Sequence, residues 1–142
     1  MFLLDVNVVP AAHRADHRHH DMVRSWFDDL VSGEQPFTVP MTIWGSSLRL
    51  STNRRVVGHP TPTDAAYEFI EQTRAQPNYL QLDTGPRHLT IIREICDSAE
   101  ATGDPVPDAV LAALAAEHSC IVATLDPDFV RFDAVRHLLL KA

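Results

Sequence analysis

The first seven residues, Met1–Asn7 (MFLLDVN), constrain the fold more than any other stretch of the chain. Apolar residues on both sides of Asp5 are typical of a strand that is covered on both faces in a parallel sheet. Burying an unpaired carboxylate is costly, so Asp5 either has a partner, such as a metal or a basic side chain, or faces a wet crevice. The segment Ile121–Asp126 has the same pattern, an apolar run that ends in an aspartate, Asp126. Ligands of open α/β sheets lie at the carboxyl ends of the strands, so the two segments indicate a shared acidic site.

Segments with helical spacing separate the strands that the sequence predicts. Helices are expected over residues 22–31, 41–51, 62–76, 87–101 and 105–116, and strands within 1–7, 36–40, 120–124 and 135–140, with a weaker one over 78–82. Asn7, Thr61 and Asp104 are expected to cap helices through their side chains. This alternation predicts βαβ units with right-handed crossovers and a mainly parallel sheet of about four to five strands. The length favours one α/β domain, residues 1–142.

Composition narrows the class of protein without identifying it. The 12 basic and 19 acidic residues give a net charge of −7, which argues against a basic coat for nucleic acid but allows a local basic stripe. The sequence has no apolar run of about 20 residues and no basic leader with a cleavage site, so no membrane segment is expected. Cys96 and Cys120 form neither a disulfide framework nor a metal-type pair. Reduced thiols and a cytoplasmic location are expected.

A third carboxylate, Asp108, lies in the first turn of a helix that is apolar all round, where the helix dipole favours an anion. If Asp5, Asp108 and Asp126 converge, their repulsion raises at least one pKa unless a cation lies between them. Oxygen ligands alone suit Mg²⁺ or Mn²⁺, and such a site can direct water at a phosphodiester. The alternative is that each aspartate only caps a helix or forms a turn.

Four segments, in this order and at these separations, resemble a known family: LLDVNV (3–8), LRLSTNR (48–54), PDAVLAALA (107–115) and VATLDPDF (122–129). They are similar to the PIN-domain ribonucleases, and more closely to the VapC toxins of bacterial VapBC toxin–antitoxin pairs, particularly the mycobacterial branch. The resemblance covers essentially the whole chain. It implies a three-layer α/β/α domain, an endoribonuclease dependent on Mg²⁺ or Mn²⁺, a homodimer and inhibition by a cognate VapB-type antitoxin. It leaves open whether the RNA is a tRNA or a ribosomal RNA loop.

The resemblance also implies roles for individual residues. Asp5, Asp108 and Asp126 correspond to the metal-binding, catalytic carboxylates of the family. Asn7 corresponds to a nearby polar residue that orients Asp5 or a water molecule, and Asp128 to a possible auxiliary carboxylate.

One position departs from the family pattern. The wider family has a glutamate where this chain has Ser46. A hydroxyl cannot replace the charge of a carboxylate, although it can hold a metal-bound water. We therefore expect one tightly held ion rather than two. Ser46 also keeps open a second interpretation, a PIN-fold binding protein whose metal site has lapsed. A phosphoacceptor receiver domain was the third alternative, and it fails because the only late lysine, Lys141, lies beyond the last expected strand.

Arg49, Arg54 and Arg55 are the best candidates for RNA contacts, because arginine binds phosphate through two N–H groups and these residues adjoin the Ser46 position. A solvated helix end or salt bridges to an antitoxin would explain them equally well.

Four histidines, residues 13, 17, 19 and 20, fall in a polar segment that we expect to face solvent, away from the carboxylates. His13 and His17 would share a helical face, which invites a metal interpretation. The alternative use of this segment is phosphate contact together with Arg14 and Arg18.

Overall fold

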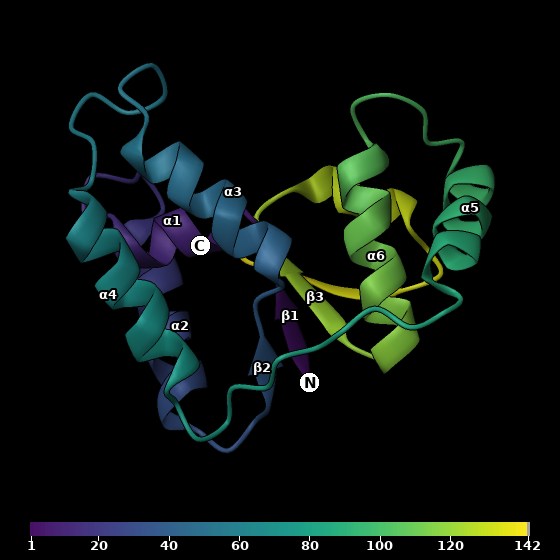
Figure 1. The fold of residues 1–142 in the computed structure, drawn as a ribbon, viewed down its shortest axis with the longest axis horizontal. Coiled ribbons are helices and arrows are strands. Elements are labelled where there is room, and N and C mark those ends of the chain that lie inside the picture. Colours follow the sequence, from purple (N-terminus) through teal and green to yellow (C-terminus); the bar gives the residue numbers. More distant parts are fainter. Residues whose placement is uncertain (142) are drawn as a thin grey trace.

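One parallel sheet forms the centre of the computed structural model, which describes residues 1–141 (Figure 1). The four strands are β1 (Phe2–Leu4), β2 (Phe37–Thr38), β3 (Ile121–Thr124) and β4 (Arg136–Leu139), in the order β2-β1-β3-β4. In register, Phe2 lies opposite Phe37 on one side and Ile121 on the other. The predicted parallel sheet is therefore confirmed. The weak strand expected at 78–82 is reduced to one bridge between Tyr79 and Phe37.

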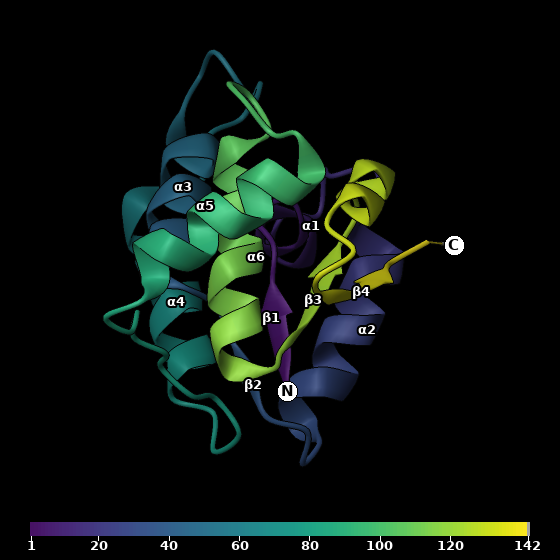
Figure 2. The same ribbon diagram turned by 90° about the vertical axis from the view of Figure 1, so that its right-hand side faces the viewer.

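Helices cover both faces of this sheet. Within residues 1–141 they are α1 (Val8–His13), α2 (His20–Ser32), α3 (Met41–Thr52), α4 (Thr63–Arg74), α5 (His88–Ala99) and α6 (Val106–His118), with a 3₁₀ helix, η1 (Pro127–Arg131), after β3. Figure 2 shows α2 on one side of the strands and α5 and α6 on the other. The domain is thus a three-layer α/β/α structure. In this part of the chain every helix is too short or too polar to cross a bilayer.

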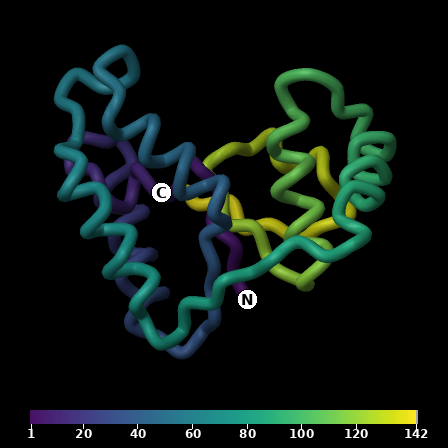
Figure 3. Tube along the Cα trace, viewed as in Figure 1, coloured from purple at the N-terminus to yellow at the C-terminus, as the bar shows by residue number. Residues whose placement is uncertain are grey.

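The two central strands and α6 form the core. Leu3, Leu4 and Val122 are fully buried, and each such side chain stabilises the fold by about 1.5–3 kcal/mol. Helix α6 buries Ala109 and the run Leu111–Ala115, and it packs between β3 and α5. This agrees with the expectation that a helix apolar all round is buried on several sides. The chain trace in Figure 3 shows that β1, at the start of the chain, runs beside β3, near its end.

The predicted helix caps are wrong at all three positions. Asn7 precedes α1, but its side chain makes no capping hydrogen bond. The Thr61 hydroxyl accepts from Arg14, and α4 begins two residues later. Pro105, not Asp104, immediately precedes α6. Tertiary partners replace local capping at Asn7 and Thr61.

Candidate metal centre

Two adjacent strands bring Asp5 and Asp126 to the same edge of the sheet. The Asp5 N–H donates to the Ala123 carbonyl at 3.0 Å, so the pairing of β1 with β3 continues to this residue. Asp126 lies two residues beyond β3. Only 3% of Asp5 is exposed, whereas Asp126 is half-buried. In Figure 1 these strand ends point into the region between α3 and α6.

Three donors hold the Asp5 carboxylate. The Thr124 hydroxyl donates to Oδ2 at 2.7 Å, the Val6 N–H donates to Oδ1 at 2.6 Å, and Asn7 Nδ2 donates to Oδ2 at 3.2 Å. Asn7 is itself fixed, because its Oδ1 accepts from the Leu125 N–H at 3.0 Å. The Asn7 side chain therefore joins the ends of β1 and β3 beside Asp5, instead of capping α1.

Thr124 is a site residue that the sequence interpretation missed. It is fully buried, and besides donating to Asp5 its hydroxyl accepts from the Asp126 N–H at 3.0 Å. One side chain thus contacts the carboxylate of Asp5 and the main chain of Asp126. The available signal was a hydroxyl residue at the end of an apolar strand, two positions before an aspartate.

Asp108, the third residue of α6, completes an acidic cluster with Asp5 and Asp126. Burial, together with repulsion from Asp5 and Asp126, raises the pKa of Asp108 to about 6, although the positive charge of Arg131 opposes this rise. Burial also raises the pKa of Asp5, and repulsion from Asp126 adds to it, despite the hydrogen bonds from Thr124, Val6 and Asn7. Three segments far apart in sequence therefore place interacting negative charges in one place.

The chemistry of this cluster fits a hard divalent cation. Buried carboxylates that repel one another are stabilised by a cation, and carboxylate oxygens are preferred by Mg²⁺ and Mn²⁺. Among residues 1–141, however, no three acidic, histidine or cysteine side chains are arranged as a finished metal site. Asp5 accepts hydrogen bonds from three donors, and Asp126 Oδ1 accepts from the Asp128 N–H at 2.8 Å. The carboxylates of Asp5 and Asp126 are thus hydrogen-bonded within the protein.

The other predicted auxiliary residues lie farther from this chemistry. Asp128 contributes its main-chain N–H to Asp126, while the residue itself is exposed. Ser46 is half-buried in the middle of α3, and in the described part of the chain no hydrogen bond joins it to the carboxylates.

The predicted RNA-binding arginines are exposed. Arg49 lies in the last turn of α3, and Arg54 and Arg55 lie in the turn that follows. None of the three forms an ion pair within residues 1–141. Arg131, in η1, was not singled out from the sequence, yet its charge acts directly on Asp108. The sequence feature that could have identified Arg131 is a basic residue shortly after Asp126.

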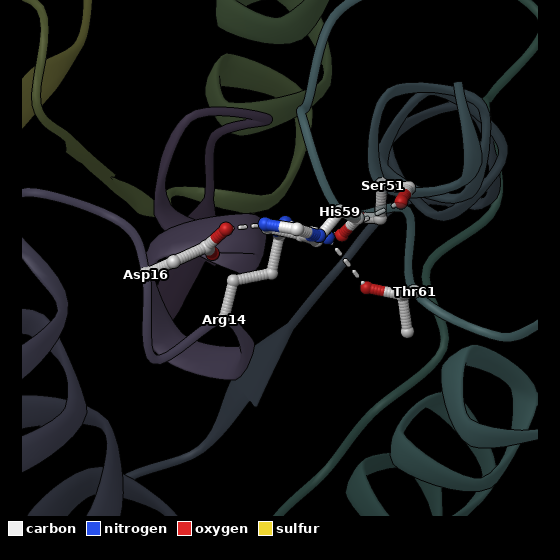
Figure 4. A network of polar contacts seen from close by, with 5 residues as sticks. All are labelled: Arg14, Asp16, Ser51, His59 and Thr61. Atoms are coloured by element: carbon white, nitrogen blue, oxygen red, sulfur yellow. Dashed lines mark hydrogen bonds and ion pairs between the residues drawn. The ribbon is translucent and has the colours of Figure 1, made fainter. Parts of the chain in front are cut away.

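Arg14 is a structural residue, which contradicts its suggested contact with phosphate. It is 8% exposed, and its guanidinium donates to Asp16, the Thr61 hydroxyl and the carbonyls of Ser51 and His59 at 2.7–3.3 Å (Figure 4). These bonds tie the end of α1 to the end of α3 and to the segment before α4.

The histidine segment is half-buried, so the expectation that it faces solvent is wrong. His13 stacks on Phe69 with ring centroids 4.3 Å apart, and His20 Nδ1 lies 2.8 Å from the Ala11 carbonyl. Helix α1 ends at His13, so His17 does not share its helical face. His17 also lines a cavity with Asn7.

Comparison with known proteins agrees with this geometry. The sequence matches the family described as "PIN domain" over residues 2–135. It is 54% identical to ribonuclease VapC25 of Mycobacterium tuberculosis over 138 residues, 97% of either chain. One similar solved structure is M. tuberculosis VapC20, described as a Sarcin-Ricin loop cleaving toxin, with a TM-score of 0.69 and 16% identity over 96% of this chain and 99% of that one. Another is VapBC2 from Rickettsia felis bound to a promoter DNA fragment, with a TM-score of 0.69 and 13% identity over 99% of this chain and 98% of that one. These two show the fold alone. The chain therefore belongs to the PIN-domain family, among the VapC ribonucleases.

Proposed function

We propose that this chain is the toxin of a type II toxin–antitoxin pair, an endoribonuclease that depends on Mg²⁺ or Mn²⁺. The observation that supports the proposal is the repulsion that Asp108, in the first turn of α6, experiences from the strand-end residues Asp5 and Asp126, which together with burial raises the pKa of Asp108 to about 6. The sequence relation to VapC25, whose name describes a ribonuclease, supports the reaction class.

In this proposal the three carboxylates hold the metal, which when bound activates water and stabilises charge on the phosphate. The protein contributes the orientation of the ligands. Thr124 and Asn7 fix the Asp5 carboxylate, and the Asp128 N–H fixes Asp126. With Ser46 lacking a carboxylate, we expect one tightly held ion.

RNA binding needs local positive charge, because the net charge of the chain is −7. Arg131 lies within electrostatic range of Asp108, and we propose that it contacts a phosphate of the strand being cut. Arg49, Arg54 and Arg55 are exposed and unpaired with acids in the described residues, so they are free to contact RNA farther along. We propose a tRNA or ribosomal RNA loop in the cytoplasm as the substrate, and residues 1–142 as one working domain.

A cognate VapB-type antitoxin and a second copy of the chain are the proposed protein partners. The similar fold of VapBC2 from Rickettsia felis, a toxin–antitoxin complex, supports the first. Co-expression with the product of the neighbouring reading frame, followed by light scattering on the purified material, tests both partners. Recovery of this chain as a monomer, both when it is expressed alone and when it is co-expressed, would contradict this part of the proposal.

The reaction is tested with purified protein and RNAs that carry single-stranded loops. We expect cleavage with Mg²⁺ or Mn²⁺ and none in excess chelator. We also expect expression of the chain alone to slow the growth of its host. A folded protein that binds RNA but does not cut it in the presence of any divalent metal would instead support the alternative interpretation. In that alternative, which Ser46 keeps open, the chain is a PIN-fold binding protein whose metal site has lapsed.

A further inference from the structure

A cavity of 580 Å³ lies between α1, the last turn of α3 and the turn that follows it. Asn7 lines this cavity and also donates to Asp5 through Nδ2. The cavity and the candidate metal centre therefore share Asn7 as a neighbour. Its volume falls within the range of about 300–1,000 Å³ that is usual for sites that enclose a small ligand.

The walls of the cavity are mainly apolar. Pro10, Leu50, Val56 and Val57 line it, and Val56 remains 52% exposed, which is unusual for a branched apolar side chain. Apolar walls with a few polar groups suit a flat ring that carries hydrogen-bonding edges.

Positive charge lies at the rim. Arg18 lines the cavity, is exposed and forms no ion pair in the described part of the chain. Asp16 lines it as well, but its carboxylate is paired with Arg14 at 2.7 Å. The rim therefore favours an anionic group next to the enclosed ring.

Arg14 keeps the cavity open. Its guanidinium donates to the Ser51 carbonyl at 3.3 Å, to the Thr61 hydroxyl at 2.8 Å and to the His59 carbonyl at 2.8 Å, so that α1, α3 and the segment before α4 are held at fixed separation (Figure 4). A preformed site loses less conformational entropy when a ligand binds.

We propose that this cavity receives an unstacked base of the RNA, next to the phosphodiester held at the carboxylates, and so determines which nucleotide stands beside the cut. The inference rests on the proposed RNA cleavage. Proteins read single-stranded loops chiefly through bases that leave the stack, and apolar walls favour the face of a base. Arg18, which lines the cavity and is exposed, would then contact a phosphate that flanks the base.

Binding is tested directly by methyl NMR on the wild-type protein. A pool of random-sequence RNA hexamers is added in Ca²⁺, an ion that accepts oxygen ligands. We expect the methyl resonances of Leu50, Val56 and Val57 to shift on titration, while those of Leu89, exposed on α5, stay in place. Shifts of the cavity methyls without any RNA cleavage in Mg²⁺ would show that RNA occupies the cavity, but would refute the proposed nuclease and with it the role of the cavity in choosing the cleaved nucleotide.

Cavity filling tests specificity. Leu50→Trp blocks the cavity, and Leu89→Trp makes the same change on a residue that is 78% exposed and remote from it. We expect Leu50→Trp to weaken hexamer binding about tenfold, the scale of one lost base contact, and to flatten the nucleotide preference next to the cut. Leu89→Trp should alter neither. Val57→Phe provides a second filling variant if Leu50→Trp fails to fold.

Two results would overturn the inference while leaving the proposed nuclease intact. One is cleavage by folded Leu50→Trp or Val57→Phe with the wild-type rate and nucleotide preference. The other is cavity methyls that ignore RNA and shift only with antitoxin, which would show that a protein segment occupies the cavity.

Discussion

The Thr124 hydroxyl donates to Asp5 Oδ2 at 2.7 Å across the two central strands, and Thr124 Oγ1 accepts from the Asp126 N–H at 3.0 Å. One buried hydroxyl therefore holds the carboxylate of Asp5 and the main chain at Asp126, two residues that are 121 positions apart. Groups of this kind tune a metal site without touching the metal.

Thr124→Val should lower metal affinity and cleavage by about 10- to 100-fold, because Asp5 loses its shortest side-chain donor. A divalent-ion titration of RNA cleavage measures the effect. Thr124→Ser keeps the hydroxyl and should restore most of the activity. Equal loss in the valine and serine variants would show that packing, rather than the hydrogen bond, matters at this position.

The contribution of Asp108 to the free energy of unfolding, measured in chelator, should fall as pH rises from about 4 to 6. Its pKa is about 6 in the folded protein against 3.8 as the ordinary value, so between these values the folded state binds more protons than the unfolded state. This contribution therefore decreases from pH 4 to pH 6 and stays lower above pH 6. The lowered pKa values of His13, His17 and Glu117 act in the opposite direction. Urea unfolding of both wild type and Asp108→Asn in chelator, between about pH 4 and 8, therefore isolates the contribution of Asp108.

Asp108→Asn should remove most of the destabilisation that the ionised Asp108 carboxylate causes at about pH 7. The metal-free protein should therefore become more stable by about 1–2 kcal/mol, after allowance for the partial exposure of this carboxyl. Asp97→Asn, at an exposed position of α5, is the matched control and should change stability little. If Asp108→Asn instead destabilises the protein in chelator, the three carboxylates do not repel one another as described.

Arg14→Met should destabilise the fold by about 2–4 kcal/mol, because it removes a buried guanidinium whose hydrogen bonds join α1 to Ser51, Thr61 and the His59 carbonyl. Arg18→Met, at an exposed neighbour, should leave the free energy of unfolding within about 0.5 kcal/mol of wild type and weaken RNA binding instead. Chemical unfolding and hexamer binding, measured on both variants, separate the two roles. The assignment fails if the two arginines behave alike.

Apolar runs and helical spacing were sufficient to predict β1, β3 and α6, and with them the positions of Asp5, Asp126 and Asp108, because these elements are defined by burial along a continuous stretch. Partners distant in sequence could not be predicted. The Thr124 hydroxyl meets Asp5 only because β1 pairs with β3.

Arg14 shows the same limit. It appeared to belong to a polar linker, yet its acceptors lie 37 to 47 residues farther along the chain, apart from the neighbouring Asp16. Thr61, expected to cap α4, serves instead as one of these acceptors. A local pattern identifies the element to which a residue belongs but not the partner that tertiary packing supplies.

RNA cleavage by wild type, Asp5→Asn, Asp108→Asn and the control Asp97→Asn, each in Mg²⁺ and in excess chelator, tests the shared carboxylate site most directly. We predict cleavage only by wild type and Asp97→Asn and only with metal, with a loss of at least about 100-fold in the two site variants. Cleavage that persists in both site variants, or in chelator, would contradict a metal held by these three aspartates.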